Sequence, residues 1–363
     1  MVRYVIPRRR RQPLRITQVS AVYPKWKRLP VGVWQTHFWQ IVVRVEANNG
    51  VVGYGYGGGG EPACLVVNQH FRELVVGTEI ESIEDIQSLW DRVYALSLPY
   101  GRKGLPIMAL SGLDLALWDL LGKAQDRPVY DLLGGLRKPR VRGYATGGKL
   151  EQYRDMGYTA AKFPPGQSSS ETDVSYTVNK AKQARSIFGD DALIMTDPYM
   201  AWDFDTTKIM ADALREFNVY WFEDVTTPDH LDEQAALREI IHPINLAGGE
   251  HEFTRFGFRQ IARAGALDIW QPDVAWCGGI TETLRILDLA REHKVPVVPH
   301  RGGEIWGLHV IAATDCEDLA ETHPERWEES GDELWIDEPR VVDGYLTPLD
   351  RPGFGVILNE AML

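Results

Sequence analysis

The chain has 363 residues, which is long for one ordinary hydrophobic core, so we expect two domains or a barrel with additions. Hydrophobic residues make up 44% and charged residues 25% of the chain, as in typical globular proteins. The formal net charge of −12 disfavours nucleic acid and anionic membranes as partners, but it does not exclude a small anion bound beside a divalent cation.

The N-terminal part of the chain, residues 1–137, predicts an α+β domain. Antiparallel strands are expected within residues 14–57, because Asn49-Gly50 is a strong hairpin signal between two β-like runs. Helices are expected near residues 81–95 and 108–124, and the second has a broad apolar face suited to packing between layers.

A glycine-rich segment, GYGYGGGG at residues 53–60, contains a formal G-x-G-x-x-G pattern. A dinucleotide site would need these glycines to open a helix within a parallel βαβ unit. Here they follow the second strand of a hairpin, so the pattern favours a flexible loop or a tight crossing of two backbone segments.

From Val141 onward the sequence becomes a repeat of short apolar runs and helical segments, which predicts a (β/α) TIM-like barrel over residues 138–328. The expected strands are at residues 141–146, 160–164, 192–197, 219–223, 245–250, 267–273, 296–300 and 318–321. The last segment, residues 329–363, is expected to return to the first domain.

Three carboxylates, Asp197, Glu223 and Glu250, each end one of these runs, at intervals of 26 and 27 residues (223 − 197 and 250 − 223). In a parallel barrel all strands deliver their last side chains to the same face. Three acids meeting there would repel one another unless a cation lay between them. Ligands that offer only oxygen favour a hard cation, so the sequence predicts a Mg²⁺ site.

The series continues with Asp273, His300 and Glu321, each again at a predicted strand end. An imidazole near the expected cation is suited to proton transfer. Any one of the six residues could instead be a helix cap or a solvated loop residue. Six of them at the same phase of a repeat make coincidence a poor explanation.

The three cysteines, Cys64, Cys277 and Cys316, are far apart and form no C-x-x-C pair, which predicts a reducing compartment. The sequence shows neither a hydrophobic signal segment nor an apolar stretch approaching the 18 residues of a membrane span. We therefore expect a cytoplasmic protein.

The motifs LSGLDLALWDLLGK, RPVYDLLGG, QPDVAWCGG and VVPH resemble the mandelate-racemase-like branch of the enolase superfamily. The resemblance implies a capping domain over a modified barrel, assembly into a homo-oligomer, and Mg²⁺ held by the three spaced carboxylates. It also implies an Asp273–His300 dyad, and contact between Glu321 and a substrate carboxylate.

Within this branch, YATGG, GYTAAKFP, GGEHEF and QPDVAWCGGIT are most similar to acid-sugar dehydratases of the rhamnonate type. Racemases of the branch carry Lys-x-Lys, whereas this chain has Lys162-Phe163-Pro164 and so lacks the second base. The resemblance therefore implies elimination of water from an aldonate, with His300 as base and Lys162 adding positive charge. The further substrate contacts expected are His251, Tyr199, Arg301 and His37.

Two other functions stay open from the sequence. The same enediolate chemistry would serve a sugar-acid epimerase or a lactone cycloisomerase. A barrel that binds a sugar acid without turnover is the third possibility, although the complete Asp273–His300 pair argues against it.

Overall fold

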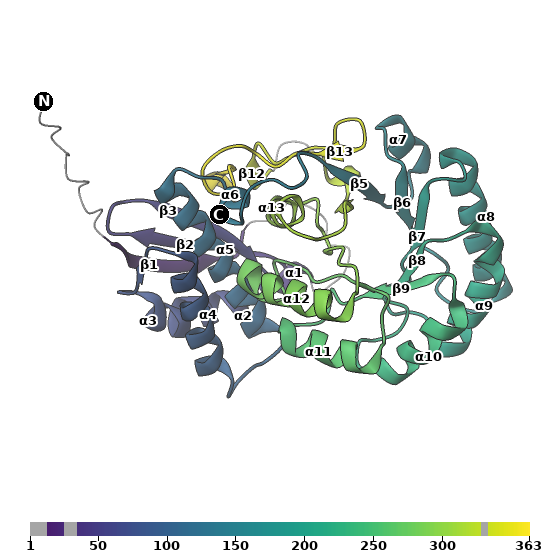
Figure 1. Cartoon of the computed structure of the whole chain (residues 1–363), viewed down its shortest axis with the longest axis horizontal. Helices are drawn as coiled ribbons and strands as arrows, with labels where there is room; N and C mark the ends of the chain where they lie inside the picture. The colour runs from purple at the N-terminus through teal and green to yellow at the C-terminus, as the bar shows by residue number, and fades with distance from the viewer. Residues whose placement is uncertain (1–12, 25–34, 328–332) are drawn as a thin grey trace, which may run out of the picture.

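The computed structural model describes residues 13–24, 35–327 and 333–363 (Figure 1). It forms one curled parallel sheet ringed by helices, with a smaller antiparallel sheet and its helices packed on one side. Residues 25–34, within the segment expected to hold antiparallel strands, lie outside the described residues.

The antiparallel sheet has the strand order β3-β2-β1-β4. Its strands are β1 (Leu14–Val22), β2 (Ile41–Ala47), β3 (Val52–Gly57) and β4 (Glu79–Ile80). The predicted hairpin is confirmed: β2 pairs with β3, and the turn between them contains Gly50 at a φ of 81°, where glycine is favoured.

Helices of the first domain pack on this sheet and on one another. They are α1 (Gln35–Phe38), α2 (Gly60–Val66), the π-helix Val67–Phe71, α3 (Arg72–Val75), α4 (Ile83–Ser97), α5 (Leu105–Gln125) and α6 (Val129–Leu132). A capping box between Ser82 and Asp85 starts α4. Pro106 stands in the first turn of α5, where its missing N–H is tolerated, so this helix begins three residues before the predicted start.

Helix α5 is long and apolar enough to cross a membrane by length and composition, contrary to the expectation that no segment approaches 18 residues. In the structure, 89% of its apolar window is buried inside the protein. Its apolar character is thus explained by its position between the antiparallel sheet and the barrel.

The glycine-rich segment is a tight backbone crossing. A Cβ atom on Gly53, Gly55 or Gly57 would lie 2.0 to 2.5 Å from a backbone carbonyl oxygen of α5. Strand β3 can therefore lie this close to α5 only because these positions have no side chain. These glycines lie in an antiparallel strand that packs on helix α5. They therefore do not form the turn of a parallel βαβ unit that binds a dinucleotide.

The parallel sheet has the strand order β10-β9-β8-β7-β6-β5-β11. The strands are β5 (Val141–Thr146), β6 (Ala160–Phe163), β7 (Leu193–Thr196), β8 (Trp221–Glu223), β9 (Asn245–Gly248), β10 (Ile269–Trp270) and β11 (Ala320–Thr322). The expected strand at 296–300 is present only as a bridge between Val297 and Trp270. The N–H of Glu317 donates to the carbonyl of Val297, which links this segment to the stretch before β11.

The interior of the barrel is filled by one side chain from each of the eight expected strand positions. This buried cluster comprises Tyr144, Ala160, Met195, Trp221, Ala247, Ile269, Val298 and Leu319. Because Val298 belongs to it, residues 296–300 fill the place of the seventh strand even without a regular ladder.

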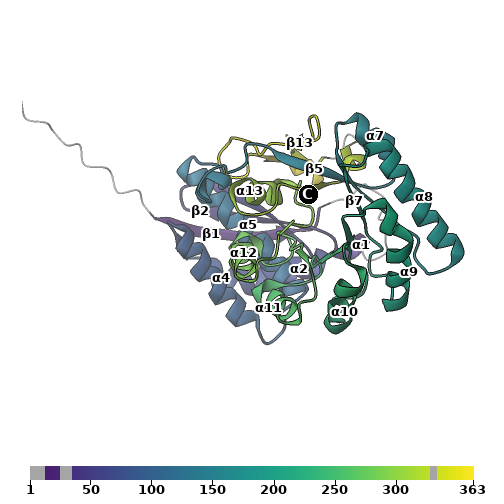
Figure 2. The ribbon, with the colours of Figure 1, turned by 45° about the vertical axis from the view of Figure 1, so that its right-hand side comes forward.

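The outer ring consists of α7 (Leu150–Asp155), α8 (Glu171–Phe188), α9 (Phe204–Leu214), α10 (Leu231–Ile241), α11 (Thr254–Ala264), α12 (Gly279–His293) and α13 (Ile305–Ala313). Figure 2 shows α8, α9 and α10 on the side away from the antiparallel sheet, with α12 and α13 nearer to it.

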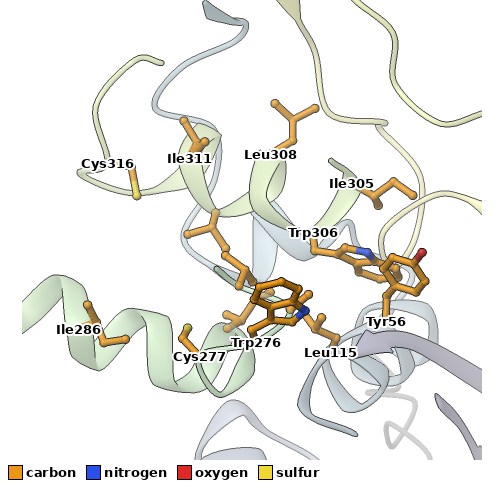
Figure 3. Packing of buried hydrophobic residues seen from close by; sticks show 14 of the residues in the cluster. Tyr56, Leu115, Trp276, Cys277, Ile286, Ile305, Trp306, Leu308, Ile311 and Cys316 are labelled. Atoms are coloured by element: carbon orange, nitrogen blue, oxygen red, sulfur yellow. The ribbon is translucent and has the colours of Figure 1, made fainter. Parts of the chain in front are cut away.

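The C-terminal segment contacts both parts of the molecule. Strands β12 (Trp335–Ile336) and β14 (Ile357–Leu358) pair with each other, and β13 (Tyr345–Leu346) pairs with the barrel strand β5. Figure 3 shows Tyr56 of β3 beside Trp306 of α13, and the ring of Trp335 lies edge-on to both. These contacts tie the first domain, the barrel and the tail into one core.

Candidate active site

The predicted site residues lie at the carboxyl ends of the barrel strands. Side chains alternate along a strand, so a residue two positions after an interior one points into the barrel again, nearer its mouth. Four predicted residues stand in this relation to the interior cluster: Lys162, Asp197, Glu223 and His300, which follow Ala160, Met195, Trp221 and Val298. Glu321 follows Leu319 in the same way. The strand repeat therefore brings one polar layer to the mouth.

Lys162 lies among three of the predicted acids and is only 2% exposed. Its Nζ contacts Glu223 directly and lies 2.9 Å from Glu321 Oε1 and 3.3 Å from Asp197 Oδ2. Burial would lower the pKa of this ammonium group, but the surrounding carboxylates raise it well above its ordinary value. Lys162 is thus a fixed positive charge at the mouth.

Glu223 is held on its other oxygen by two neutral donors. Trp221 Nε1 donates to Oε2 at 3.0 Å, and Gln271 Nε2 donates to the same atom at 2.8 Å. Burial, together with the charge of Asp197, raises the pKa of Glu223 to about 8 even though Lys162 acts in the opposite direction. The lysine therefore does not offset all the negative charge that gathers here.

Glu250 lies among the histidines of the site. Its Oε2 is 3.0 Å from His300 Nε2, and its Oε1 is 3.0 Å from His251 Nε2. Burial would raise the pKa of Glu250, but the two imidazoles lower it to about 2. Ligand atoms of Asp224, Glu250 and His251 all lie within 4.8 Å of one another, close enough for one metal ion to contact them.

The donor set fits a hard divalent cation. Asp224 Oδ2 is buried and accepts no hydrogen bond from the described residues. Burial and the charge of Glu250 raise the pKa of Asp224 well above its ordinary value and raise that of Asp197. Buried carboxylates that resist ionisation in this way indicate negative charge that lacks a counterion. The predicted ligands Asp197 and Glu223 face Lys162. The third predicted ligand, Glu250, belongs to the cluster with Asp224 and His251.

The predicted dyad is formed in the structure. His300 Nδ1 lies 2.7 Å from Asp273 Oδ2, which leaves Nε2 as the ring atom directed into the site. Burial would lower the pKa of His300, but the carboxylates around it, above all Glu250, raise it to about 9. Burial would likewise raise the pKa of Asp273, but Arg301 and His300 bring it below its ordinary value.

Glu321 accepts hydrogen bonds from Thr146 Oγ1 at 2.6 Å and from the N–H of Arg301 at 2.9 Å. Burial opposes its ionisation, but Lys162 and His300 lower the pKa of Glu321 well below its ordinary value. This carboxylate is therefore ionised in the structure, with Lys162 as its counterion.

The four expected substrate contacts differ in position. Tyr199 is 51% exposed, and its ring lies edge-on to His251, so both residues border the mouth. Arg301 is 4% exposed and points to Asp273, behind the dyad. His37 lies in α1 against Phe38, and the described residues give no contact between it and the barrel acids.

Four residues near the site were not predicted from the sequence: Thr146, Asp224, Gln271 and Trp276. The period of two could have indicated Thr146 and Gln271, because they follow the interior residues Tyr144 and Ile269 by two positions. Trp276 packs near His251, His300 and Arg301, and no strand-end signal marks it.

Two family models together match most of the chain. Residues 16–134 match the N-terminal domain of the mandelate racemase / muconate lactonizing enzymes, and residues 146–362 match the enolase C-terminal domain-like family. The first match covers the part of the chain that contains the antiparallel sheet, and the second covers the barrel.

Comparisons with individual proteins indicate the same family. The chain is 37% identical over 327 residues to L-rhamnonate dehydratase from Saccharopolyspora erythraea, covering 88% of this chain and 83% of that protein. It is similar to the Mg-complexed rhamnonate dehydratase from Gibberella zeae, with a TM-score of 0.87, 32% identity, and coverage of 97% and 96% of the two chains.

The 3,6-anhydro-D-galactonate cycloisomerase from Zobellia galactanivorans is also similar, with a TM-score of 0.82, 26% identity, and coverage of 96% and 97% of the two chains. Relatives with different reactions thus share this fold. From the family matches and the identity to a curated relative, the chain belongs to the mandelate racemase / muconate lactonizing enzyme family of the enolase superfamily.

Proposed function

We propose that the protein is a Mg²⁺-dependent acid-sugar dehydratase that converts an aldonate to a 2-keto-3-deoxy acid. The single observation that supports this most directly is the pair of His300 and Asp273 beside a dense carboxylate cluster, with no second lysine after Lys162. The relatives named rhamnonate dehydratase favour the same reaction class.

In this proposal Glu250, Asp197 and Glu223 hold the cation, with Asp224 and His251 close enough to contribute. When bound, Mg²⁺ supplies positive charge where negative charge develops on the substrate carboxylate, an effect worth several kcal/mol. A cation held by Glu250 would also offset the charge that contributes most to the raised pKa of His300. The imidazole then becomes available as a base.

His300 Nε2 takes the proton next to the substrate carboxylate, while Asp273 holds Nδ1 and stabilises the imidazolium that forms. The protonated ring then gives its proton to the departing 3-hydroxyl group. An ionised Glu321 alone would repel the substrate carboxylate, so the ammonium group of Lys162, 2.9 Å away, is needed to offset that charge.

A second candidate function is cycloisomerisation of a sugar acid, favoured by the similarity to the Zobellia galactanivorans enzyme. The two reactions share removal of the α-proton and differ in the next step. Mass spectrometry of the product separates them, because dehydration lowers the mass of the substrate by that of one water molecule, whereas the rival reaction leaves the mass unchanged.

The proposal is tested by screening a library of aldonates and aldarates with Mg²⁺ for keto-acid formation. We expect turnover of at least one aldonate, its loss on chelation with EDTA, and a fall of at least about 100-fold in kcat for His300→Asn. Turnover that survives both treatments would contradict the proposal. Binding without turnover of any compound in the library would favour a non-catalytic sugar-acid binder.

A further inference from the structure

We propose that Arg301 is a positioning residue of this site: it fixes the carboxylates of Asp273 and Glu321 on either side of His300. The inference rests on the proposed function, because it assigns a role within that proton-transfer site. It also replaces the expectation that Arg301 contacts the substrate.

The side chain of Arg301 shares one oxygen atom with the dyad. Arg301 Nε donates to Asp273 Oδ2 at 2.9 Å, and Nη2 lies 2.7 Å from the same atom. His300 Nδ1 approaches that oxygen at 2.7 Å. The other oxygen, Oδ1, accepts the N–H of Ala275 at 2.8 Å. The guanidinium group therefore holds the carboxylate in the plane and rotamer that the imidazole needs.

The backbone of Arg301 holds the second acid. Its N–H donates to Glu321 Oε2 at 2.9 Å, at a residue whose φ is 50°. This left-handed conformation is unusual for a residue other than glycine and requires support from the surrounding structure. It directs the N–H toward Glu321 while the side chain reaches Asp273, so one residue spans both carboxylates.

Aromatic rings keep the guanidinium group in place. Its central carbon lies 4.8 Å from the ring centre of Trp276 and 5.6 Å from that of Trp39. Trp276 Nε1 donates to Gln40 Oε1 at 2.8 Å, and Gln40 is fully buried immediately before β2. Trp276 and Leu115 of α5 belong to the same buried hydrophobic cluster (Figure 3). The first domain thus supports Arg301 through Trp39 and Trp276.

The burial of the Arg301 side chain favours a positioning role over direct contact with the substrate. The Arg301 side chain is 3% exposed, whereas the His300 side chain is 12% exposed and the Tyr199 residue 51% exposed. The guanidinium group lies among the carboxylates of Asp273 and Glu304, the latter 4.0 Å from Nη1, and two indole rings, so it has little surface left for a ligand. Its influence on the reaction must therefore pass through the groups that it holds.

A double-mutant cycle in the full-length Mg²⁺-loaded enzyme tests this route, using the aldonate found in the library screen. We expect Arg301→Gln to lower kcat about tenfold or more with KM changed less than about threefold, and Arg301→Lys to restore part of the loss. In the Asp273→Asn background, Arg301→Gln should lower kcat by less than about twofold.

Arg255→Gln is the matched control. Arg255 pairs with the buried Glu282 at 2.6 Å and lies over the ring of Phe256, but it belongs to α11, outside the site. We expect it to lower the melting temperature without changing kcat. A rise in KM at unchanged kcat for Arg301→Gln, or an undiminished effect in the Asp273→Asn background, would overturn the inference.

Crystal structures of the wild type and Arg301→Gln give a readout that needs no substrate. We expect the Asp273 carboxylate to leave the 2.7 Å contact with His300 Nδ1 in the variant. If this contact stays intact, the positioning role is wrong even where turnover is detected. If it breaks while no aldonate is converted, the positioning role holds and the proposed reaction fails.

Discussion

One lysine supplies much of the positive charge at the barrel mouth. Lys162 touches Asp197, Glu223 and Glu321, and all four side chains come from different strands. Removing one partner of a buried ionic cluster leaves the others without a counterion, which typically costs about 3 to 5 kcal/mol. Lys162 should therefore stabilise the metal-free protein as well as take part in the reaction.

We expect Lys162→Met to lower the free energy of unfolding of the metal-free protein by about 3 kcal/mol or more, measured by urea denaturation in EDTA. Added Mg²⁺ should recover more stability in the variant than in the wild type, because the cation then faces unpaired carboxylates. Equal recovery in the two proteins would show that the lysine and the metal do not share the same acids.

Residue identity at strand ends was enough to predict the five acids and the histidine, because the barrel repeats one geometry. The orientation of individual side chains was not predictable in the same way. Arg301 was expected to contact the substrate, and in the structure, at a φ of 50°, its side chain points to Asp273. Pattern alone does not indicate such a local backbone conformation.

The packing of β3 on α5 is decided by glycine at every second position. Gly55 is the tightest of these contacts, since a Cβ there would lie 2.0 Å from the carbonyl oxygen of Gly112. The backbone of Gly55 fixes the position of this Cβ, and the oxygen belongs to the backbone of α5, so no side-chain rotation can relieve the overlap. The strand and the helix would have to separate.

We expect Gly55→Ala to destabilise the protein by about 3 kcal/mol or more, as overpacking against backbone does. Gly148→Ala is the matched control, because, apart from its chain neighbours, no atom of the described residues lies within 4 Å of its would-be Cβ. Thermal denaturation of both variants checks the difference. If the two melting temperatures agree, the crossing is looser than these contacts imply.

Helices and strands were predicted well where the hydrophobic periodicity extends over many residues. They were predicted less well where tertiary contacts determine the local structure. The hairpin and helices α4 and α5 agree with their expected positions to within a few residues. Residues 296–300 had the composition of a strand but form a single bridge, through Val297. On the side of this segment toward β11, the N–H of Glu317 donates to the carbonyl of Val297, and this hydrogen bond takes the place of a regular β-ladder.

The junction of the first domain, the barrel and the tail contains a buried histidine. His309 of α13 accepts the N–H of Tyr130 at its Nδ1 and packs against the rings of Tyr130 and Phe354. Burial lowers the pKa of this imidazole to about 3. It is therefore neutral in the folded protein at any pH at which the site could work.

This histidine should make the stability of the whole molecule depend on pH. In the unfolded chain its pKa is near 6.5, so between about pH 6.5 and pH 3 the unfolded state binds a proton that the folded state does not. Stability is then lost as the pH falls through this window, by about 1.4 kcal/mol at pH 5.5.

We expect His309→Gln, whose side-chain oxygen can still accept the N–H of Tyr130, to lack this component. Urea denaturation at pH 8 and pH 5.5 should show the wild type losing about 1.4 kcal/mol more than the variant, because the other titrating groups cancel in the difference. Equal losses in the two proteins would mean that His309 becomes protonated without unfolding, and hence that the junction opens to water.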